Sequence, residues 1–426
     1  MPEYSPVIII GGGQAGLSMS YCLKQKGIEH IVFEKNKIGY AWQEQRWDTF
    51  CLVTPNWQCQ LPGFPYPGER PHGFMPKDKI VRYLQDYVDF FQPPLHEGIE
   101  VFKVCRSDTG GFELETTQGG YRADQVVIAA GGYHRPKIPA IAQRLPEHIV
   151  QLHSSTYKNP ESLPDQPILV VGTGQSGCQI AEDLHLAGKQ VHLCVGSAPR
   201  SPRRYRGKDV VDWLDQMGYY DIPIDEHPQK ETVRHKTNHY LTGRDGGHEI
   251  DLRQFALEGM QLYGRLDNIS SGHLEFQNNL KENLDHADEV AESIKQTIDE
   301  FIAKNQLQAP TEPPYEPVWQ PESEIPKLNC ERAQIGAVIW SIGYGIDFSW
   351  IDIPIFNGDG YPGHHRGVTN VQGLYFLGLP WLYTWGSGRF SGIAQDASYL
   401  CDQIAQQAKT FHPNPTRQLN EVAIGS

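Results

Sequence analysis

The sequence predicts an α/β protein that contains two units of the same type, each with helices packed on a mainly parallel sheet. Three observations support this fold class. Wholly apolar runs at residues 7–10 and 168–171 are typical of parallel strands buried on both faces. A glycine-rich turn follows each run, and a helical segment follows each turn. The two strand–turn–helix segments lie about 160 residues apart, which indicates an internal repeat.

The first unit has the element order of a βαβ motif. After the strand at 7–10 and its turn, residues 17–26 predict a helix that Gly27 ends, and residues 31–34 predict the next strand. A loop rich in proline, glycine and aromatic residues covers 37–76. Its aromatic content argues against disorder and favours a functional loop.

The first unit continues with a helix at 77–91. Short alternating segments between residues 99 and 122 predict a small antiparallel meander, and a strand at 126–130 returns to the main sheet. Near the C-terminus, a strand at 374–378 and a last helix at 391–407 follow. These elements belong to one domain built from both ends of the chain.

The second unit lies between these two parts. Its strand at 168–171 leads through a turn into a helix at 178–187 and a strand at 191–195. Residues 283–303 have the periodicity of an amphipathic helix packed on its own domain. A further apolar strand is expected at 337–341.

Two Rossmann-like dinucleotide-binding domains are therefore expected. The sequence predicts an FAD-binding domain in two parts, with an NADPH-binding domain inserted between them. The expected boundaries are 1–160 for the first part, 161–326 for the inserted domain and 327–426 for the second part.

Composition excludes several other classes of protein. The chain of 426 residues has a formal net charge of −14, which argues against nucleic acid and anionic membranes as partners. It has no apolar run of the ~18 residues that cross a bilayer, and we expect a cytoplasmic protein without membrane insertion. The eight cysteines form no C-x-x-C pair and no zinc-site spacing, so no metal is expected. Association into a homo-oligomer is left open.

The first glycine-rich turn carries the pattern of a dinucleotide site. Gly11 permits the tight turn, Gly13 lets the backbone approach a pyrophosphate, and Gly16 lets helix and strand pack closely. Glu34 stands eighteen residues after Gly16, where a carboxylate accepts ribose hydroxyls and repels a 2′-phosphate. The site therefore suits FAD or NAD(H). Its expected residues are Gly11, Gly13, Gln14, Ala15, Gly16, Glu34 and Lys35.

The second turn lacks an acidic residue at the position that corresponds to Glu34 of the first. Val195 lies eighteen residues after Gly177, and five cations follow within residues 200–208. Guanidinium groups bind phosphate in a bidentate fork, which favours Arg203 and Arg204 as ligands of the 2′-phosphate of NADPH over a solvated basic loop. The other expected residues of this site are Gly172, Gly174, Gln175, Ser176 and Gly177.

Two dinucleotide sites in one chain imply hydride transfer from nicotinamide to flavin. Without a close cysteine pair, the reduced flavin would pass its electrons to dioxygen, a quinone or another small molecule. Three functions follow: a monooxygenase, an oxidase or reductase that forms peroxide or reduces a quinone, and a redox sensor that signals to a partner.

Short segments of the chain also resemble a known family. They are Gly-Tyr-Ala-Trp at 39–42, Arg-Trp-Asp at 46–48, Thr-Pro-Asn at 54–56 and Gln-Leu-Pro at 60–62, together with the strand ends at 127–131 and 339–350. They are similar to segments of the class B flavoprotein monooxygenases, which include flavin-containing monooxygenases and plant YUCCA-type enzymes. The resemblance covers nearly the whole chain, least well from 205 to 326.

The resemblance implies a reaction and several site residues. FAD would be reduced by NADPH, react with dioxygen to a C4a-hydroperoxide and transfer one oxygen atom to a small organic substrate. Asn56 would lie near the flavin C4a position, as catalytic residue, although an ordinary turn asparagine is equally compatible. Trp42 and Arg46 would line the FAD. The remaining expected cofactor contacts are Ala130, Gly131, Gly378 and Gln395.

Two departures from the family pattern indicate a divergent member. In the signature segment at 147–157, His153, Ser154 and Tyr157 match, but Glu147 and Ile149 replace a phenylalanine and a glycine. A leucine follows Gly378 where the family has an aspartate. An aromatic cluster at 381–385 is interpreted either as a substrate wall or as core packing.

Overall fold

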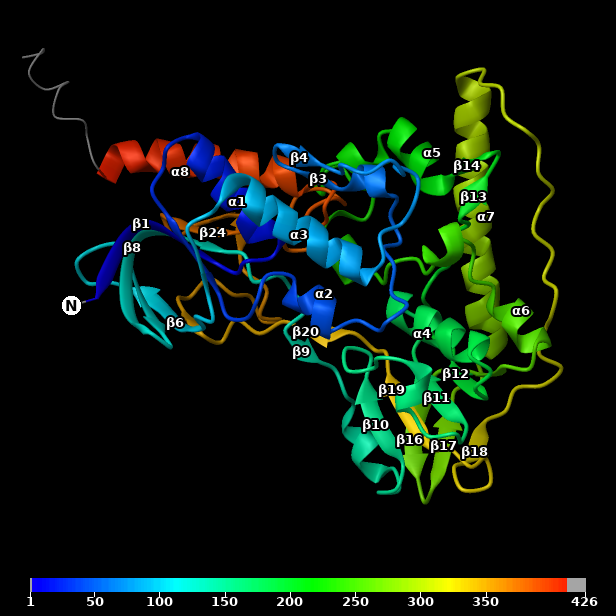
Figure 1. Ribbon diagram of the computed structural model, residues 1–426. Coiled ribbons are helices and arrows are strands. Elements are labelled where there is room, and N and C mark those ends of the chain that lie inside the picture. The colour runs from blue at the N-terminus through cyan, green and yellow to red at the C-terminus, as the bar shows by residue number, and fades with distance from the viewer. Residues whose placement is uncertain (1, 412–426) are drawn as a thin grey trace, which may run out of the picture.

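The computed structural model describes residues 2–411, and two sheets organise them (Figure 1). In the larger sheet, β1 (Glu3–Ile10) lies between β2 (Ile31–Glu34) and β8 (Gly119–Ile128), parallel to both. β5 (Leu95–Glu97) continues the parallel order beyond β2, and β24 (Leu374–Phe376) pairs in parallel with the last residues of β8, on the side away from β1. All parallel strands of this sheet therefore end at one edge, next to the first glycine-rich turn.

β8 pairs with different strands along its two halves. Its first half pairs antiparallel with β7 (Phe112–Thr116), which pairs with β6 (Val101–Arg106), and its second half pairs in parallel with β24. The expected meander is present as β6, β7 and the first half of β8. Its last segment and the expected return strand at 126–130 form the single strand β8, which pairs with β1 from Glu3 to Ile10. β21 (Ile351–Asp352) extends the edge at β6, and the short strands β22 (His364–His365) and β23 (Val368–Thr369) extend the edge at β24.

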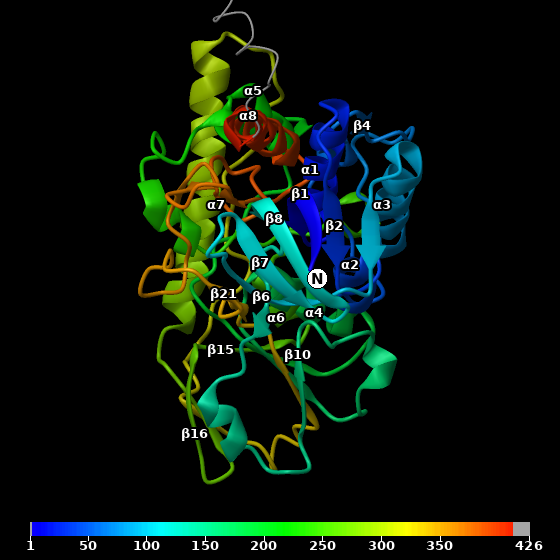
Figure 2. The ribbon, with the colours of Figure 1, turned by 90° about the vertical axis from the view of Figure 1, so that its left-hand side faces the viewer.

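Three helices cover one face of the larger sheet (Figures 1 and 2). They are α1 (Gln14–Gln25), α3 (Lys77–Phe91) and α8 (Ile393–Phe411), and their apolar side chains share one core with β1. The predicted helix at 77–91 is confirmed, and α1 begins three residues earlier than predicted because its first turn includes the last residues of the glycine motif. The opposite face packs on the meander and on residues 348–356.

The second sheet is entirely parallel. Its order is β10 (Val150–His153), β19 (Ala337–Trp340), β11 (Ile168–Val171), β12 (Val191–Cys194) and β15 (Gln261–Tyr263).

Helices and a small sheet cover the two faces of the second sheet. On one face lie α4 (Gln175–Leu186) and the first turns of α7 (Leu280–Lys304). On the other face lies an antiparallel sheet of β16 (Leu266–Ser270), β17 (His273–Phe276) and β18 (Lys327–Asn329).

The membership of β10 and β19 differs from the expected domain boundaries. The boundaries at 160 and 327 assign both strands to the first domain, but β19 pairs with β10 and β11 in the middle of the second sheet. The sequences of β10 and β19 would suit a strand in either sheet. Only the observed strand pairing shows that they belong to the second sheet. The chain crosses between the domains at β9 (Arg135–Pro136) and β20 (Tyr344–Gly345), which pair with each other.

The segments that the sequence left irregular attach to both domains. α5 (Val210–Gln216), α6 (Leu252–Leu257) and the hairpin of β13 (Arg204–Tyr205) and β14 (Lys208–Asp209) precede α7, a long rod along one side of the molecule (Figure 1). In the early loop lie α2 (Tyr40–Glu44), β3 (Gln60–Leu61) and β4 (Phe64–Pro65).

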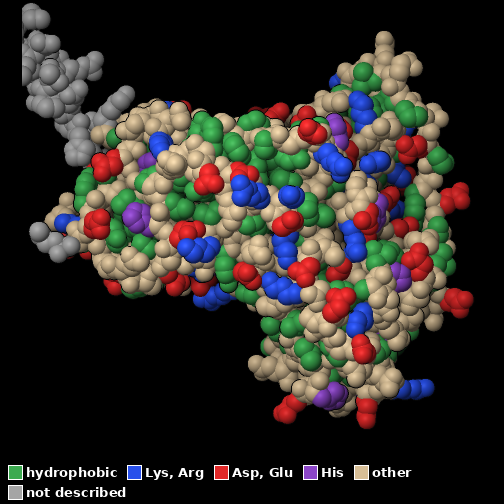
Figure 3. All heavy atoms as spheres, in the orientation of Figure 1, with side chains coloured by type: hydrophobic (Ala, Val, Ile, Leu, Met, Phe, Trp, Pro, Cys, Tyr) green, Lys and Arg blue, Asp and Glu red, His purple; other side chains and the backbone are tan. Residues whose placement is uncertain are grey.

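On the face in Figure 3, acidic and basic side chains lie among one another. None of the helices within residues 2–411 combines the length and the apolar character that crossing a membrane requires.

Candidate functional site: two glycine-rich turns and the segment between them

The first glycine-rich turn is closed by contacts that only glycine allows. Gly11 has φ +111°, and a Cβ on it would lie 2.5 Å from the carbonyl oxygen of Ala129. A Cβ on Gly16 would lie 1.8 Å from the oxygen of Gly11. At Gly13, by contrast, a Cβ would meet nothing within 4 Å. The backbone is therefore open on the side where the N-terminus of α1 offers free N–H groups to an anion.

Glu34 lies beside this turn at the carboxyl end of β2. Its Oε2 accepts a hydrogen bond from the N–H of Gly12 at 2.7 Å, and its Oε1 accepts one from Asn36 at 2.8 Å. These bonds hold a carboxylate next to the turn, as expected for a group that binds ribose hydroxyls and excludes a further phosphate. Lys35 follows and is exposed.

Residues 378–388, which follow β24 and are called the chain end here, also contact the first turn. Gly378 lies two residues after the end of β24. A Cβ on it would lie 2.6 Å from Cβ of Ala15. Gln14 donates from Nε2 to the oxygen of Gly388 at 3.0 Å. Ala130 and Gly131 lie at the end of the neighbouring β8, with Gly131 at φ +74°.

Gln395 is exposed in the first turn of α8. Contacts among the described residues thus bring Glu34, the residues after β8 and those at Gly378 and Gly388 to the N-terminus of α1.

The second turn repeats the geometry of the first. Gly172 has φ +102°, and a Cβ on it would lie 2.8 Å from the oxygen of Ser341. A Cβ on Gly177 would lie 1.9 Å from the oxygen of Gly172. A Cβ on Gly174 would lie 3.7 Å from Cγ2 of Thr237, and Ser176 is partly buried at the start of α4.

One segment beside the second turn could not be identified from the sequence. Gln175 and Gln179 on α4 both donate to the oxygen of Leu241. Residues 237–241 therefore line this turn, although no local pattern marks them, because only the tertiary fold brings them to α4.

The basic cluster of residues 200–208 is largely neutralised inside the protein. Arg203 is 2% exposed, forms an ion pair with Asp209 at 2.6 Å and donates to the oxygen of Val53 at 2.6 Å. Arg200 is equally buried between Glu249 and Asp288.

Arg204 is arranged differently from its neighbour. It is exposed and donates to the oxygen of Gly246 at 3.3 Å. Of the two arginines expected at a 2′-phosphate, only Arg204 presents its guanidinium to solvent. The carboxylates that engage Arg203 and Arg200 stand elsewhere in the sequence, so the pattern of cations alone did not reveal them.

Asn56 has a buried acceptor without a donor. Its side chain is 3% exposed, its Nδ2 donates to the oxygen of Arg70 at 3.0 Å, and its Oδ1 has no partner within the described part of the chain. Gln58, two residues on, has the same feature at Oε1, and the sequence analysis did not single it out. Leaving such an atom unpaired costs about 1–3 kcal/mol. A bound group with N–H donors, such as a flavin ring, fits this observation.

Trp42 and Arg46 form a wall between the early loop and the chain end. The guanidinium of Arg46 lies 5.3 Å from the ring of Trp42 and 5.5 Å from that of Phe50. Trp42 in turn stacks on Phe390, with ring centroids 5.9 Å apart. Arg46 is thus held by aromatic faces, and its cation remains available to an anionic ligand.

A short chain of contacts connects the two turns. Thr237 lies beside Gly174, and the next residue, Asn238, accepts a hydrogen bond from Arg389 at 3.1 Å. Arg389 follows Gly388, whose oxygen is bonded to Gln14 of the first turn. These contacts link the two turns through a junction at Asn238 and Arg389. Hydride transfer requires two bound nucleotides to lie close together.

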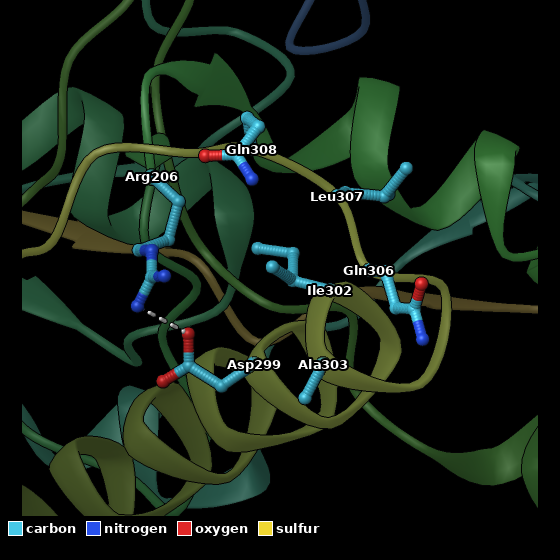
Figure 4. A pocket seen from close by; sticks show the side chains of 7 residues that line it. All are labelled: Arg206, Asp299, Ile302, Ala303, Gln306, Leu307 and Gln308. Carbon is cyan, nitrogen blue, oxygen red and sulfur yellow. Dashed lines mark hydrogen bonds and ion pairs between the residues drawn. The ribbon is translucent and has the colours of Figure 1, made fainter.

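A separate pocket of about 510 Å³ lies at the C-terminal end of α7 (Figure 4). An ion pair between Arg206 and Asp299, 3.0 Å long, borders it. None of the residues around both turns lines it. Within residues 2–411, no group of three or more His, Cys, Asp or Glu side chains is arranged to hold a metal ion.

Comparisons with known proteins agree with this geometry. Residues 8–255 match the model of the pyridine nucleotide-disulphide oxidoreductase family. An uncharacterized CzcO-like oxidoreductase of Geobacillus kaustophilus is 33% identical over 95% of this chain and 99% of its own length. A probable indole-3-pyruvate monooxygenase, YUCCA4 of Arabidopsis thaliana, is 28% identical over 47% of this chain and 49% of its own.

The fold is also that of a solved enzyme. A flavin-containing monooxygenase from Stenotrophomonas maltophilia shares it with a TM-score of 0.64 and 17% identity, over 95% of this chain and 99% of the other. The fold and the paired turns define a flavin-dependent oxidoreductase. The chain belongs to the pyridine nucleotide-disulphide oxidoreductase family. The predicted fold class and family are confirmed.

Proposed function

We propose that the protein is an NADPH-dependent monooxygenase that holds FAD at the first glycine-rich turn and NADPH at the second. The observation that carries the proposal is the repeated turn geometry, with Glu34 beside the first turn and no acid at the corresponding place of the second, after which Arg204 is exposed. FAD, when bound there, would supply hydride acceptance from NADPH and activation of dioxygen, of which one atom enters a small organic substrate and the other leaves as water.

The residues of the chain have separate roles in this proposal. The α1 N-terminus and Gly13 receive the pyrophosphate of FAD, and Glu34 receives its ribose. Asn56 offers its free Oδ1 to a donor on the flavin or the nicotinamide amide. The stacked wall of Trp42, Phe390 and Arg46 excludes water from the flavin.

A rapid-mixing experiment tests the proposal. The purified holoenzyme is reduced with NADPH without oxygen and then mixed with dissolved dioxygen while its visible spectrum is recorded. We expect a transient that differs from both reduced and oxidised flavin and lasts longer than the mixing time. Direct return to oxidised flavin with stoichiometric peroxide, also in the presence of candidate substrates, would instead identify an oxidase or reductase.

A further inference from the structure

Arg389 is a partly buried cation that has no carboxylate partner among the described residues. It lies in the loop between β24 and α8, and its guanidinium covers the ring of Trp385 at 4.1 Å. It donates to the oxygen of Trp385 and, at 3.1 Å, to Oδ1 of Asn238. Its charge interacts electrostatically with three tyrosines: Tyr133, Tyr219 and Tyr220.

Other buried arginines of this chain form ion pairs, unlike Arg389. Arg200, Arg203 and Arg253 are each 1–2% exposed, and each forms an ion pair with one or two carboxylates. Burial without such a pair lowers the pKa of Arg389 from its ordinary value, yet a guanidinium stays protonated at neutral pH. In a chain with a net charge of −14, a cation left without a carboxylate at the junction of the two turns is suited to a ligand that brings the anion.

The surroundings of Arg389 are aromatic. The rings of Tyr220 and Trp385 lie 4.5 Å apart, and those of Tyr219 and Tyr220 lie 5.7 Å apart. Burial raises the pKa of both tyrosines, so their hydroxyls remain neutral and can donate hydrogen bonds. Tyr219 and Tyr220 come from the segment between α5 and α6, which the sequence left irregular. Trp385 belongs to the cluster at 381–385, which the sequence analysis interpreted either as a substrate wall or as core packing.

We propose that Arg389 binds the carboxylate of the substrate, and that the substrate is a small organic acid whose apolar or aromatic body lies against Trp385, Tyr219 and Tyr220. The inference rests on the proposed function, because it places this acid at the junction where the flavin of the first turn would meet it. A guanidinium forms paired, charge-assisted hydrogen bonds with a carboxylate, and aromatic rings provide contact area for an apolar body.

The experiment compares an acid with its neutral amide. Oxidised, FAD-loaded enzyme is titrated with 3-phenylpropionate and with 3-phenylpropionamide, and binding is followed by the flavin spectrum and by tryptophan fluorescence. The wild-type protein should bind the acid about tenfold or more tightly than the amide, as expected for a charge-assisted hydrogen bond. Equal affinities for acid and amide, or binding of neither, would overturn the proposal.

Variants assign this preference to one residue. Arg389→Gln should bind acid and amide about equally, and Arg389→Lys should keep part of the preference even if the glutamine variant does not fold. The matched control is Arg234→Gln in the same aromatic region, because Arg234 is already paired with Glu231 at 3.1 Å. It should keep the full preference, whereas an Arg389→Gln protein that also keeps it would refute the inference.

The reaction of the flavin is measured separately in the same proteins. A titration of Arg389→Gln and of the wild type with NADPH shows whether this side chain also acts on the nucleotide. A weakened affinity for NADPH with an unchanged acid preference would assign Arg389 to the nucleotide and overturn the proposal. If the wild-type enzyme shows no oxygen transient but prefers the acid through Arg389, the proposed oxygenation fails while the acid site stands.

Discussion

At the scale of single residues, the partners of a side chain decide its role. Arg203 and Arg204 are adjacent in the sequence, yet one is enclosed by Asp209 and Val53 and the other is exposed. Asn56 is buried with a free acceptor, which a turn asparagine on the surface would not be. The residue types were visible in the sequence, whereas these differences arise from segments far away along the chain.

The two arginines should therefore respond differently to substitution. Arg204→Ala is expected to raise the KM for NADPH about tenfold or more and to leave the KM for NADH nearly unchanged, because only NADPH has the 2′-phosphate. Steady-state kinetics with both nucleotides measure this difference. Equal effects on both nucleotides would remove Arg204 from the phosphate site.

Arg203→Ala should act on stability instead. It leaves Asp209 buried without its partner, for which we expect a loss on the order of 3 kcal/mol in the free energy of unfolding. Denaturant unfolding measures the loss, and Arg204→Ala serves as the control with little change. A fully stable Arg203→Ala protein with impaired NADPH binding would reverse the two roles.

Asp396, in the first turn of α8, should make stability depend on pH. Burial raises the pKa of its carboxyl to about 6, so the folded protein binds a proton that the unfolded chain releases. As pH rises from about 4 through 6, this group therefore destabilises the fold, by on the order of 2–3 kcal/mol when fully ionised. Asp396→Asn should gain stability over the wild type at pH 8 and not at pH 4.5. A difference that is independent of pH would contradict this assignment.

At the scale of elements, local sequence was most informative where one element is self-contained. The helix at 77–91 has the predicted ends, and both glycine turns stand between a strand and a helix as predicted. The sequence was less informative about β8, since an extended segment with polar residues in the middle can be one strand or two. Its pairing with β1 from Glu3 to Ile10 shows that the segment is a single strand.

Two glycines of the first turn separate binding from folding. Gly16→Ala would place a Cβ 1.8 Å from the oxygen of Gly11, so we expect insoluble or strongly destabilised protein. Gly13→Ala meets open space, so that protein should fold with nearly wild-type stability and lose FAD during purification because the Cβ blocks the pyrophosphate. Flavin content and thermal unfolding distinguish the two. A fully loaded Gly13→Ala protein would argue against FAD at this turn.

At the scale of the whole molecule, two strands from outside the expected domain complete the second sheet. β10 and β19 lie side by side, and β19 is a central strand flanked by β11. Residues 137–345 therefore form one continuous segment with all five strands, and the crossovers β9 and β20 lie at its two ends.

This arrangement predicts which fragment folds alone. A fragment of residues 137–345 should show a cooperative thermal transition and bind NADPH more tightly than NADH. A fragment of residues 161–326 lacks β10 and β19, which removes a central strand and exposes β11, so it should aggregate or remain unfolded. Circular dichroism and fluorescence titration compare them. Equal folding of both fragments would mean that the second sheet does not need these strands.

The two strand–turn–helix units, the acid beside the first turn and the family could be predicted from the sequence, because these depend on residues close together in the chain and on backbone geometry that only glycine allows. Three features became visible only in the folded protein: the sheet that β19 joins, the burial of Arg203 beside the exposed Arg204, and the position of Arg389 near tyrosines at the junction. The physical reason is that burial and ion pairing depend on partners up to hundreds of residues away, which periodicity and spacing along the sequence do not reveal.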